Sequence, residues 1–324
     1  MQYRLLGRTG LRVSELFLGA MSFGDGGASP AEARRIIDLY DDTGGNVIDT
    51  ANVYRDGQSE SILGDVLHGR RDRFVLATKY TLSRDITDPN AAGNHRKSLT
   101  LSLEQSLKRL RTDYIDIYWA HLWDRHTPVD ETMRALDDAV RAGKILYVGI
   151  SDAPAWVVAQ ANTLAHWRGW TPFAGLQVPY NLLQRDIERE LLPMAESFEM
   201  TVAAWSPLAH GVLTGRSCDL TPQQHTVVAA VREVADEIGA TPAQVALAWT
   251  RSHSAAVHPI LGASTVEQLA DNLGVLDTTL SEEQVRRLEA AADFTLGFPS
   301  DFLAQSHPGA FGTASNGLDR GARR

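Results

Sequence analysis

Residues 46–60, NVIDTANVYRDGQSE, combine a short apolar strand, a polar loop and the start of a helix. The strand ends on Asp49, and Tyr54 stands in the loop that follows. Ser59 and Glu60 then open the predicted helix. A carboxylate at the end of one strand means little by itself, but it becomes informative when the other strands also end in chemically capable groups.

Eight short apolar runs are spread along the chain and alternate with amphipathic segments of helical spacing. These runs are Leu16–Leu18, Val47–Ile48, Phe74–Ala77, Tyr114–Trp119, Ile145–Ile150, Phe173–Val178, Thr201–Trp205 and Ala256–Ile260. This alternation predicts a parallel sheet closed into a (β/α)8 TIM barrel. The competing fold is an open, doubly wound sheet, which is disfavoured because no G-x-G-x-x-G follows the first strand.

Helix starts are predicted where Ser or Thr precedes Pro or an acidic residue. The candidates are Ser29–Pro30, Thr127–Pro128, Thr241–Pro242 and Ser264–Glu267. Before the first run, Tyr3–Leu6 and Arg12–Val13 flank Arg8-Thr9-Gly10 and predict a β-hairpin. We expect one domain over residues 1–304, and a mobile tail over 305–324 because that stretch is rich in Gly, Ser and Ala.

Composition narrows the class of protein. The chain has 324 residues, of which 44% are hydrophobic, and a net charge of -9. The negative charge argues against a nucleic-acid partner, and no stretch approaches the ~20 apolar residues of a membrane span. The N-terminus has no apolar signal core, and the single Cys218 excludes an internal disulfide. We expect a cytoplasmic protein with a small-molecule partner.

Chemically capable residues stand at consecutive strand ends. Asp49 ends the second strand, Tyr54 lies in its loop, Lys79 ends the third strand and His121 ends the fourth. In a (β/α)8 barrel these ends meet at one mouth, where active sites are built. An ammonium lowers the pKa of a nearby tyrosine, so this set could protonate a carbonyl oxygen, with His121 orienting the substrate. No nucleophile is evident, which implies a hydride cofactor.

A metal site is the competing interpretation of HLWDRH at residues 121–126. Zinc needs three or four well-placed ligands. Arg125 interrupts this stretch and no His-x-His pair occurs elsewhere, so we expect no metal.

The chain resembles the aldo-keto reductases over roughly residues 3–290, in the branch that includes potassium-channel β-subunits and aryl-alcohol dehydrogenases. The matching motifs are GRTGLRVSELFLGAMSFG (7–24), NVIDTANVY (46–54), GQSESILG (57–64), Lys79, YWAHLWD (118–124), GKILYVGISD (143–152), GLQVPYNLL (175–183), AWSPLAHGVLTG (204–215) and ILGASTVEQLADNL (260–273). The resemblance implies a barrel with its bottom closed by the N-terminal hairpin, reduction of aldehydes or ketones with NADPH or NADH, and a tetrad of Asp49, Tyr54, Lys79 and His121.

The same resemblance implies a set of cofactor-binding residues. These are Met21, Ser151, Asp152, Gln177, Trp205, Ser206, Leu208, Gly211, Gly262, Ala263, Ser264, Gln268 and Asn272. Two positions depart from the family pattern. Asp152 stands where the family usually has Asn, and a carboxylate cannot donate a hydrogen bond as an amide does. Gln268 stands where an Arg often meets the 2′-phosphate of NADPH, and residues 259–272 contain neither Lys nor Arg, so NADH stays open.

Substrate contacts are predicted for Phe23, Tyr80 and Trp123, with Met21, because their loops face the mouth. The three aromatic residues Phe294, Phe298 and Phe302 could form a flap over the site or dock on the barrel wall. Two alternatives to a general reductase stay open. One is a cofactor-binding regulatory module with slow chemistry. The other is a sugar reductase of bacterial secondary metabolism, because GNHRKSL (93–99) is similar to actinobacterial members of the family.

Overall fold

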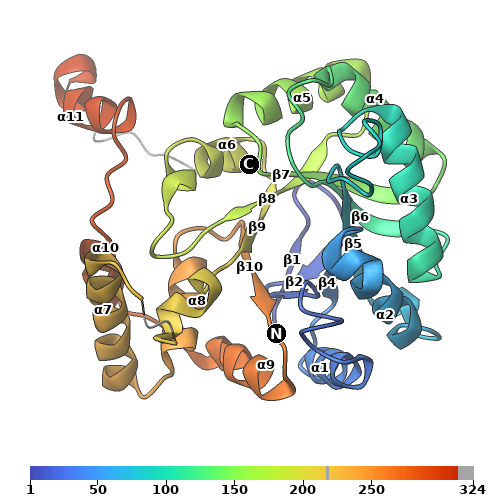
Figure 1. Cartoon of the computed structure of the whole chain (residues 1–324). Coiled ribbons are helices and arrows are strands. Elements are labelled where there is room, and N and C mark those ends of the chain that lie inside the picture. The colour runs from blue at the N-terminus through green and yellow to red at the C-terminus, as the bar shows by residue number, and fades with distance from the viewer. Residues whose placement is uncertain (217–218, 313–324) are drawn as a thin grey trace.

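Eight parallel strands form a closed barrel in the computed structural model, which describes residues 1–216 and 219–312 (Figure 1). The strand order around the barrel is β10-β3-β4-β5-β6-β7-β8-β9. Their bounds are β3 Phe17–Gly19, β4 Val47–Asp49, β5 Val75–Tyr80, β6 Ile115–Ala120, β7 Ile145–Ser151, β8 Phe173–Pro179, β9 Thr201–Trp205 and β10 Val257–Gly262. The predicted (β/α)8 barrel is therefore confirmed.

Helices surround this barrel, apart from the last one, α11. They are α1 Pro30–Asp42, α2 Gln58–Val66, α3 Arg96–Leu110, α4 Val129–Arg141, α5 Ala155–Arg168, α6 Leu191–Ser197, α7 Pro222–Ile238, α8 Pro242–Ser252, α9 Val266–Leu273, α10 Glu282–Ala292 and α11 Ser300–Phe311. Short 3₁₀ turns are η1 Tyr54–Gly57, η2 Arg71–Arg73, η3 Asp186–Glu188, η4 Ala209–Thr214 and η5 Gly274–Asp277. None of the described helices is long and apolar enough to cross a membrane.

Most predicted helix starts are confirmed, since Ser29, Thr241 and Thr265 each accept a hydrogen bond from the backbone three residues on. The prediction at Thr127–Pro128 is shifted by one residue. Pro128 is the N-cap of α4, and the hydroxyl of Thr127 donates instead to Asp124. The carboxylate of Asp124 therefore replaces the helix end as the partner of this hydroxyl.

The N-terminal hairpin, β1 Tyr3–Leu5 and β2 Arg12–Ser14, closes one end of the barrel. Leu6 and Val13 are fully buried and pack in a cluster with inward-facing residues of the strands. The backbone N–H of Gly7 donates to the hydroxyl of Thr201, at the start of β9. Because β9 begins there, the hairpin covers the N-terminal ends of the strands and leaves their C-terminal ends free for a site.

Two glycines make room for the largest inward-facing side chain. A Cβ at Gly149 would lie 2.3 Å from the ring of Trp119, and one at Gly175 would lie 2.8 Å from it. Both contacts are shorter than van der Waals packing allows, so the indole fills the space that side chains at these positions would take. Trp119 is fully buried. The indole therefore fills part of the barrel interior.

The C-terminal segment stands apart from the barrel. In Figure 1 an extended stretch leads from α10 to α11, which lies away from the strands. The side chain of Phe298 is 84% exposed and that of Phe302 is 58% exposed. The two rings contact each other, whereas the ring of Phe294 lies beneath the guanidinium groups of Arg185 and Arg189. None of these three rings lines the cavity described below, so the flap over the site is not formed here.

The predicted mobile tail begins inside this last helix, because residues 305–311 belong to α11. The rest of the predicted tail, 313–324, lies outside the described residues.

Candidate active site

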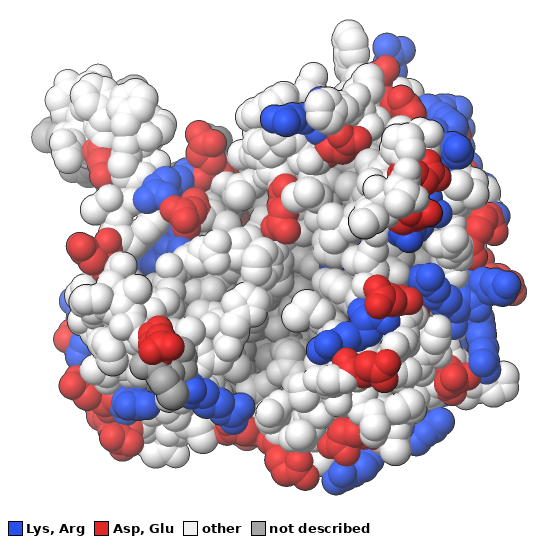
Figure 2. All heavy atoms as spheres, in the orientation of Figure 1, with Lys and Arg blue, Asp and Glu red and all other residues white. Residues whose placement is uncertain are grey.

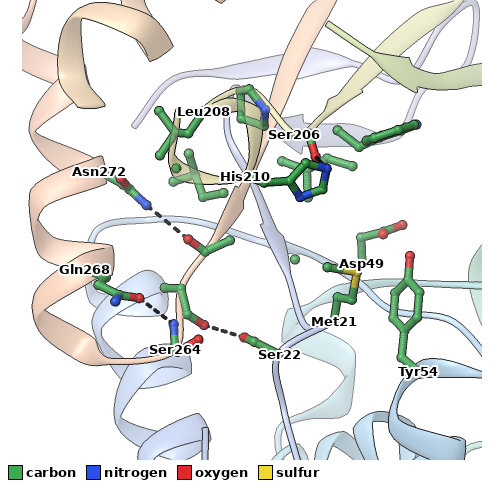
Figure 3. Close-up of a pocket in the computed structure, with 18 of the residues that line it drawn as sticks. Met21, Ser22, Asp49, Tyr54, Ser206, Leu208, His210, Ser264, Gln268 and Asn272 are labelled. Atoms are coloured by element: carbon green, nitrogen blue, oxygen red, sulfur yellow. Dashed lines mark hydrogen bonds between the residues drawn. The ribbon is translucent and has the colours of Figure 1, made fainter. Parts of the chain in front are cut away.

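A cavity of about 560 Å³ opens among the C-terminal ends of the strands. This volume is within the range of small-molecule sites, roughly 300–1,000 Å³. Figure 3 shows Asp49 and Tyr54 at one end of the cavity, and Gln268 and Asn272 on α9 at the other. Figure 2 shows a hollow near the centre of the face seen in Figure 1, lined mainly by uncharged residues. A long cavity with chemically different ends suits an extended ligand.

Lys79 and Asp49 form a buried ion pair at the first end. Their side chains are 0% and 5% exposed. The ammonium of Lys79 also donates to the backbone carbonyl of Thr50, at 2.7 Å, and Gln177 Nε2 donates to the second oxygen of Asp49, at 3.0 Å. Both charges therefore have hydrogen-bond partners besides each other, which a buried ion pair requires. Burial opposes the charged form of Lys79, but Asp49 and then Tyr54 outweigh it and raise the pKa of Lys79.

Tyr54 lies against both Lys79 and His121. The Lys79 ammonium is 4.9 Å from the centre of the phenol ring, and the rings of Tyr54 and His121 meet edge to face with their centres 5.8 Å apart. Burial raises the pKa of Tyr54, and this effect exceeds the opposing effect of Lys79. The predicted effect of Lys79 is therefore present, since it lowers the pKa of Tyr54, but burial raises this pKa by more. Asp49 itself acts to raise this pKa, because its charge offsets that of Lys79.

His121 is neutral at physiological pH. Burial, and then the charge of Lys79, lowers the pKa of its imidazole to about 3. Its Nδ1 atom is buried without a hydrogen-bond partner in the described part of the chain. A neutral imidazole can orient a carbonyl oxygen through its one N–H, but it lacks the acidic second proton of an imidazolium.

The start of α2 holds the Tyr54 loop in place. The hydroxyl of Ser59 donates to the carbonyl of Ala20, and the buried carboxylate of Glu60 accepts hydrogen bonds from Thr78 at 2.7 Å and Arg109 at 3.3 Å. The loop itself needs this support, because Arg55 takes the left-handed conformation at a φ of 51°. The sequence GQSE thus positions Tyr54 through residues that touch nothing in the cavity.

Every residue predicted to bind the cofactor lines the cavity, together with Asp49, Tyr54 and His121. These cofactor candidates are Met21, Ser151, Asp152, Gln177, Trp205, Ser206, Leu208, Gly211, Gly262, Ala263, Ser264, Gln268 and Asn272. Several are fixed by hydrogen bonds that Figure 3 draws: Gln268 accepts from the backbone of Ser264 at 2.8 Å, and Asn272 donates to the carbonyl of Gly262 at 3.2 Å. Sequence and structure thus delimit the same cavity.

The three aromatic substrate candidates do not line this cavity. Phe23 and Tyr80 are fully buried in the layer between strands and helices, where the ring of Tyr80 stacks on that of Tyr118 at 5.2 Å. Alternation along β5 explains this position: Lys79 points into the barrel, so its neighbour Tyr80 points outward. Trp123 packs edge to face against Trp156 outside the lining. The burial of Phe23 and Tyr80 corrects the prediction of substrate contacts at these two positions, and the half-buried Trp123 lies outside the lining of this cavity.

Sequence reasoning missed other lining residues. They are Gly19, Ser22, Leu82, Pro207, His210, Thr214, Arg216, Leu247, Ile260 and Leu261. Arg216 is the most consequential, because it lies near Gln268 and brings a cation to the second end of the cavity. A signal for it exists in the sequence, since it directly follows the motif AWSPLAHGVLTG, residues 204–215, that was assigned to the cofactor. In the described ranges, no group of three or more His, Cys, Asp or Glu side chains could hold a metal ion.

The fold and the site define an oxidoreductase barrel, and comparison with known proteins names its family. Residues 15–293 match the aldo/keto reductase family, and the chain belongs to it. It is 41% identical over 320 residues to the norsolorinic acid reductase stcV of Emericella nidulans, covering 92% of this chain and 83% of that protein. A norsolorinic acid reductase of Aspergillus flavus is 38% identical over 319 residues, with 92% and 82% covered.

The aryl-alcohol dehydrogenase [NADP(+)] of Phanerodontia chrysosporium is 38% identical to the chain over 328 residues, with 90% of this chain and 85% of that protein covered. The protein is therefore an enzyme, an NAD(P)H-dependent oxidoreductase that reduces a carbonyl group to an alcohol. Nothing in these comparisons favours a regulatory module over an enzyme.

Proposed function

We propose that Tyr54 is the general acid of the reduction and that Lys79, Asp49 and His121 support it. The observation that carries this assignment is the contact of the Tyr54 ring with both the Lys79 ammonium and the His121 ring at one end of the cavity. A nicotinamide cofactor held in this cavity would supply the hydride for the carbonyl carbon. The developing alkoxide then takes the proton of Tyr54, and the positive charge of Lys79 stabilises the phenolate that remains.

The remaining two groups have distinct roles in this proposal. Asp49 fixes the Lys79 ammonium in place, since the two form the buried ion pair described above. His121 is neutral and faces the same cavity, so it orients the substrate oxygen rather than protonating it. The raised pKa of Tyr54 keeps its proton in place until the substrate oxygen becomes basic.

We further propose that the preferred cofactor is NADPH. The 2′-phosphate that distinguishes NADPH from NADH needs a cation, and charge-assisted pairing with Arg is the strong way to hold it. Arg216 lines both the main cavity and the adjoining hollow that contains Gln268 and Asp271. It forms no ion pair with any other described residue. Its guanidinium is exposed and free to meet a phosphate.

Titrations of the purified protein with NADPH and NADH test this preference, with quenching of tryptophan fluorescence as the signal, because Trp205 lines the cavity. We expect Arg216→Ala to weaken NADPH binding about tenfold, or ~1.4 kcal/mol, and to leave NADH binding nearly unchanged. Arg168→Ala is the control, because Arg168 is exposed at the end of α5 and away from the cavity. Equal losses for both cofactors in Arg216→Ala would contradict the assignment.

We propose an aromatic aldehyde or ketone as the substrate. Relatives named for norsolorinic acid and aryl alcohols support this class, and apolar side chains of Met21 and Leu82 line the cavity. The ratio of kcat/KM for an aryl aldehyde to that for an aldose of similar size measures the preference. We expect the aryl aldehyde to be favoured at least tenfold, the order of one well-filled apolar contact. A preference for the aldose would favour the sugar-reductase alternative.

A further inference from the structure

Asp152 is a carboxylate at the Tyr54 end of the cavity that the proposed reduction does not use. It follows the last residue of β7 and lines the cavity together with Tyr54 and His121. One carboxylate oxygen accepts a hydrogen bond from the indole Nε1 of Trp205, at 3.1 Å. Its charge also acts on Tyr54, raising the pKa of the phenol. The carboxylate is therefore held in place, and it is close enough to the reacting groups to influence them.

Asp152 differs from Asp49 because no ion pair compensates its charge. Asp49 is paired with Lys79, so these two charges largely cancel. Burial raises the pKa of Asp152, hydrogen bonds from Trp205 and Ser151 oppose this rise, and Lys79 is only a minor influence. Among the described residues no Lys or Arg forms an ion pair with Asp152. Tyr54 and His121 are both neutral, the first because its pKa is raised and the second because its pKa is lowered to about 3. Asp152 is thus the uncompensated charge at this end.

The backbone at Asp152 does not require a carboxylate. Its φ is +46°, a left-handed conformation that Asp and Asn tolerate better than other non-glycine residues. An asparagine would satisfy the backbone equally well, and its side-chain oxygen could accept the same hydrogen bond from Trp205. Negative charge is the property that aspartate adds here.

We propose that Asp152 makes the enzyme bind the oxidised nicotinamide cofactor more tightly than it would without this charge, relative to the reduced cofactor. This inference rests on the proposed function, which places the hydride donor beside Tyr54. The two forms of the cofactor differ by one positive charge on the ring, and an uncompensated carboxylate close to that ring attracts the cation. The cavity then has opposite charges at its ends, with Asp152 for the ring and Arg216 for the phosphates.

The consequence for the reaction follows from thermodynamic linkage. A site that stabilises the oxidised form relative to the reduced form lowers the reduction potential of the bound pair, so the bound reduced form becomes a stronger hydride donor. Two electrons move with the hydride to the carbonyl carbon, and the proton of Tyr54 goes to the oxygen. Asp152 neither gains nor loses a proton in this step, and it is a positioning and electrostatic residue rather than a catalytic one.

The test measures the dissociation constants of NADP⁺ and NADPH for the wild-type protein and for Asp152→Asn. We expect the ratio Kd(NADP⁺)/Kd(NADPH) to rise about tenfold in the variant, which corresponds to about 30 mV for a two-electron pair. Both cofactor forms carry the same carboxamide and phosphates. Any change in hydrogen bonding to those groups therefore cancels in the ratio, and the ratio reports the charge alone.

Asp56→Asn is the matched control. Asp56 has nearly the same backbone conformation, with a φ of 54°, but it is exposed and does not line the cavity. Its variant loses the same formal charge, and we expect its ratio to equal that of the wild type. Asp152→Gly provides a second variant, since glycine accepts a positive φ at no cost, and it should shift the ratio in the same direction as Asp152→Asn.

The outcomes separate this inference from the function on which it rests. An unchanged ratio in folded Asp152→Asn and Asp152→Gly overturns the inference and leaves the reductase intact. The same rise in Asp56→Asn would mean that overall charge sets the ratio, and it would overturn the inference as well. Failure of the wild-type protein to bind either cofactor would instead overturn the proposed function.

Discussion

The two ends of the cavity are built in different ways. At one end Asp49 and Lys79 project from barrel strands and are almost completely buried. At the other end Gln268 stands on α9, and Arg216 lies in the chain that follows η4 and is exposed. Burial therefore decides the charge state of each group at the first end. Solvent and loop conformation decide how firmly an anion is held at the second.

This contrast separates chemistry from recognition. The end with Asp49 and Lys79 has fixed partners for every charge except that of Asp152. This arrangement suits proton transfer in a site that is organised before the substrate arrives. The end with Gln268 and Arg216 offers one exposed cation, the guanidinium of Arg216, which suits reversible binding of a phosphate. Substitutions at the first end should consequently change turnover and stability, whereas Arg216→Ala should change cofactor affinity alone.

The largest effect is expected for Tyr54→Phe. Loss of the phenol proton should reduce kcat by about 10²–10⁴-fold, while NADPH binding changes little because the ring is kept. Steady-state reduction of an aryl aldehyde and cofactor titration measure the two effects. Tyr80→Phe is the matched control: the Tyr80 hydroxyl is buried, has no hydrogen-bond partner in the described structure and lies outside the cavity.

Full activity of Tyr54→Phe would contradict the assignment of proton transfer to the end of the cavity that holds Asp49 and Lys79. Full activity of Tyr80→Phe is expected, and a large loss there would restore the prediction from sequence that Tyr80 contacts the substrate.

The next effect concerns stability. Lys79→Met leaves the carboxylate of Asp49 buried without its cation, and Gln177 alone cannot replace the lost charge. We expect unfolding free energy to fall by about 3–5 kcal/mol, as when one partner of a buried ion pair is removed. Urea unfolding followed by circular dichroism gives this value. The double variant Asp49→Asn/Lys79→Met should recover much of the stability but none of the activity.

If the double variant were no more stable than Lys79→Met, the loss would come from packing of the lysine stem rather than from the unpaired charge. The contribution of this end to stability would then come from side-chain packing rather than from electrostatics.

Much of the fold was predictable because its signals are local. Alternating apolar runs and amphipathic segments give the barrel, and strand ends then bring Asp49, Lys79 and His121 together without further information. The side of the sheet to which each side chain points was harder to predict from the sequence. Tyr80 follows Lys79 in sequence but faces the opposite side of β5, and only the assignment of Lys79 to the interior reveals this.

Arg216 shows a different limit. Residues 259–272, where the family pattern places the phosphate-binding cation, contain neither Lys nor Arg, whereas Arg216 lies about fifty positions before Gln268. The position of Arg216 directly after residues 204–215 indicates a place near the cofactor, but its approach to Gln268 depends on loop conformation. The effect of Lys79 on the pKa of Tyr54 was predictable, but the larger opposing effect of burial was not, because it depends on how much protein surrounds the phenol.

The pH dependence of kcat/KM should show the smallest change, but it distinguishes Tyr54 from His121 as the proton donor. For reduction the protonated form of Tyr54 is active, and its raised pKa keeps that form populated above the ordinary tyrosine value of about 10. If His121 were the donor, its pKa of about 3 would leave it without a proton at neutral pH, and activity would already be lost near pH 5. We therefore expect kcat/KM for the carbonyl, at saturating NADPH, to stay flat from about pH 6 to 9 and to fall only at higher pH. A steady decline from pH 5 upward would assign the proton to His121 and reverse the roles of the two rings.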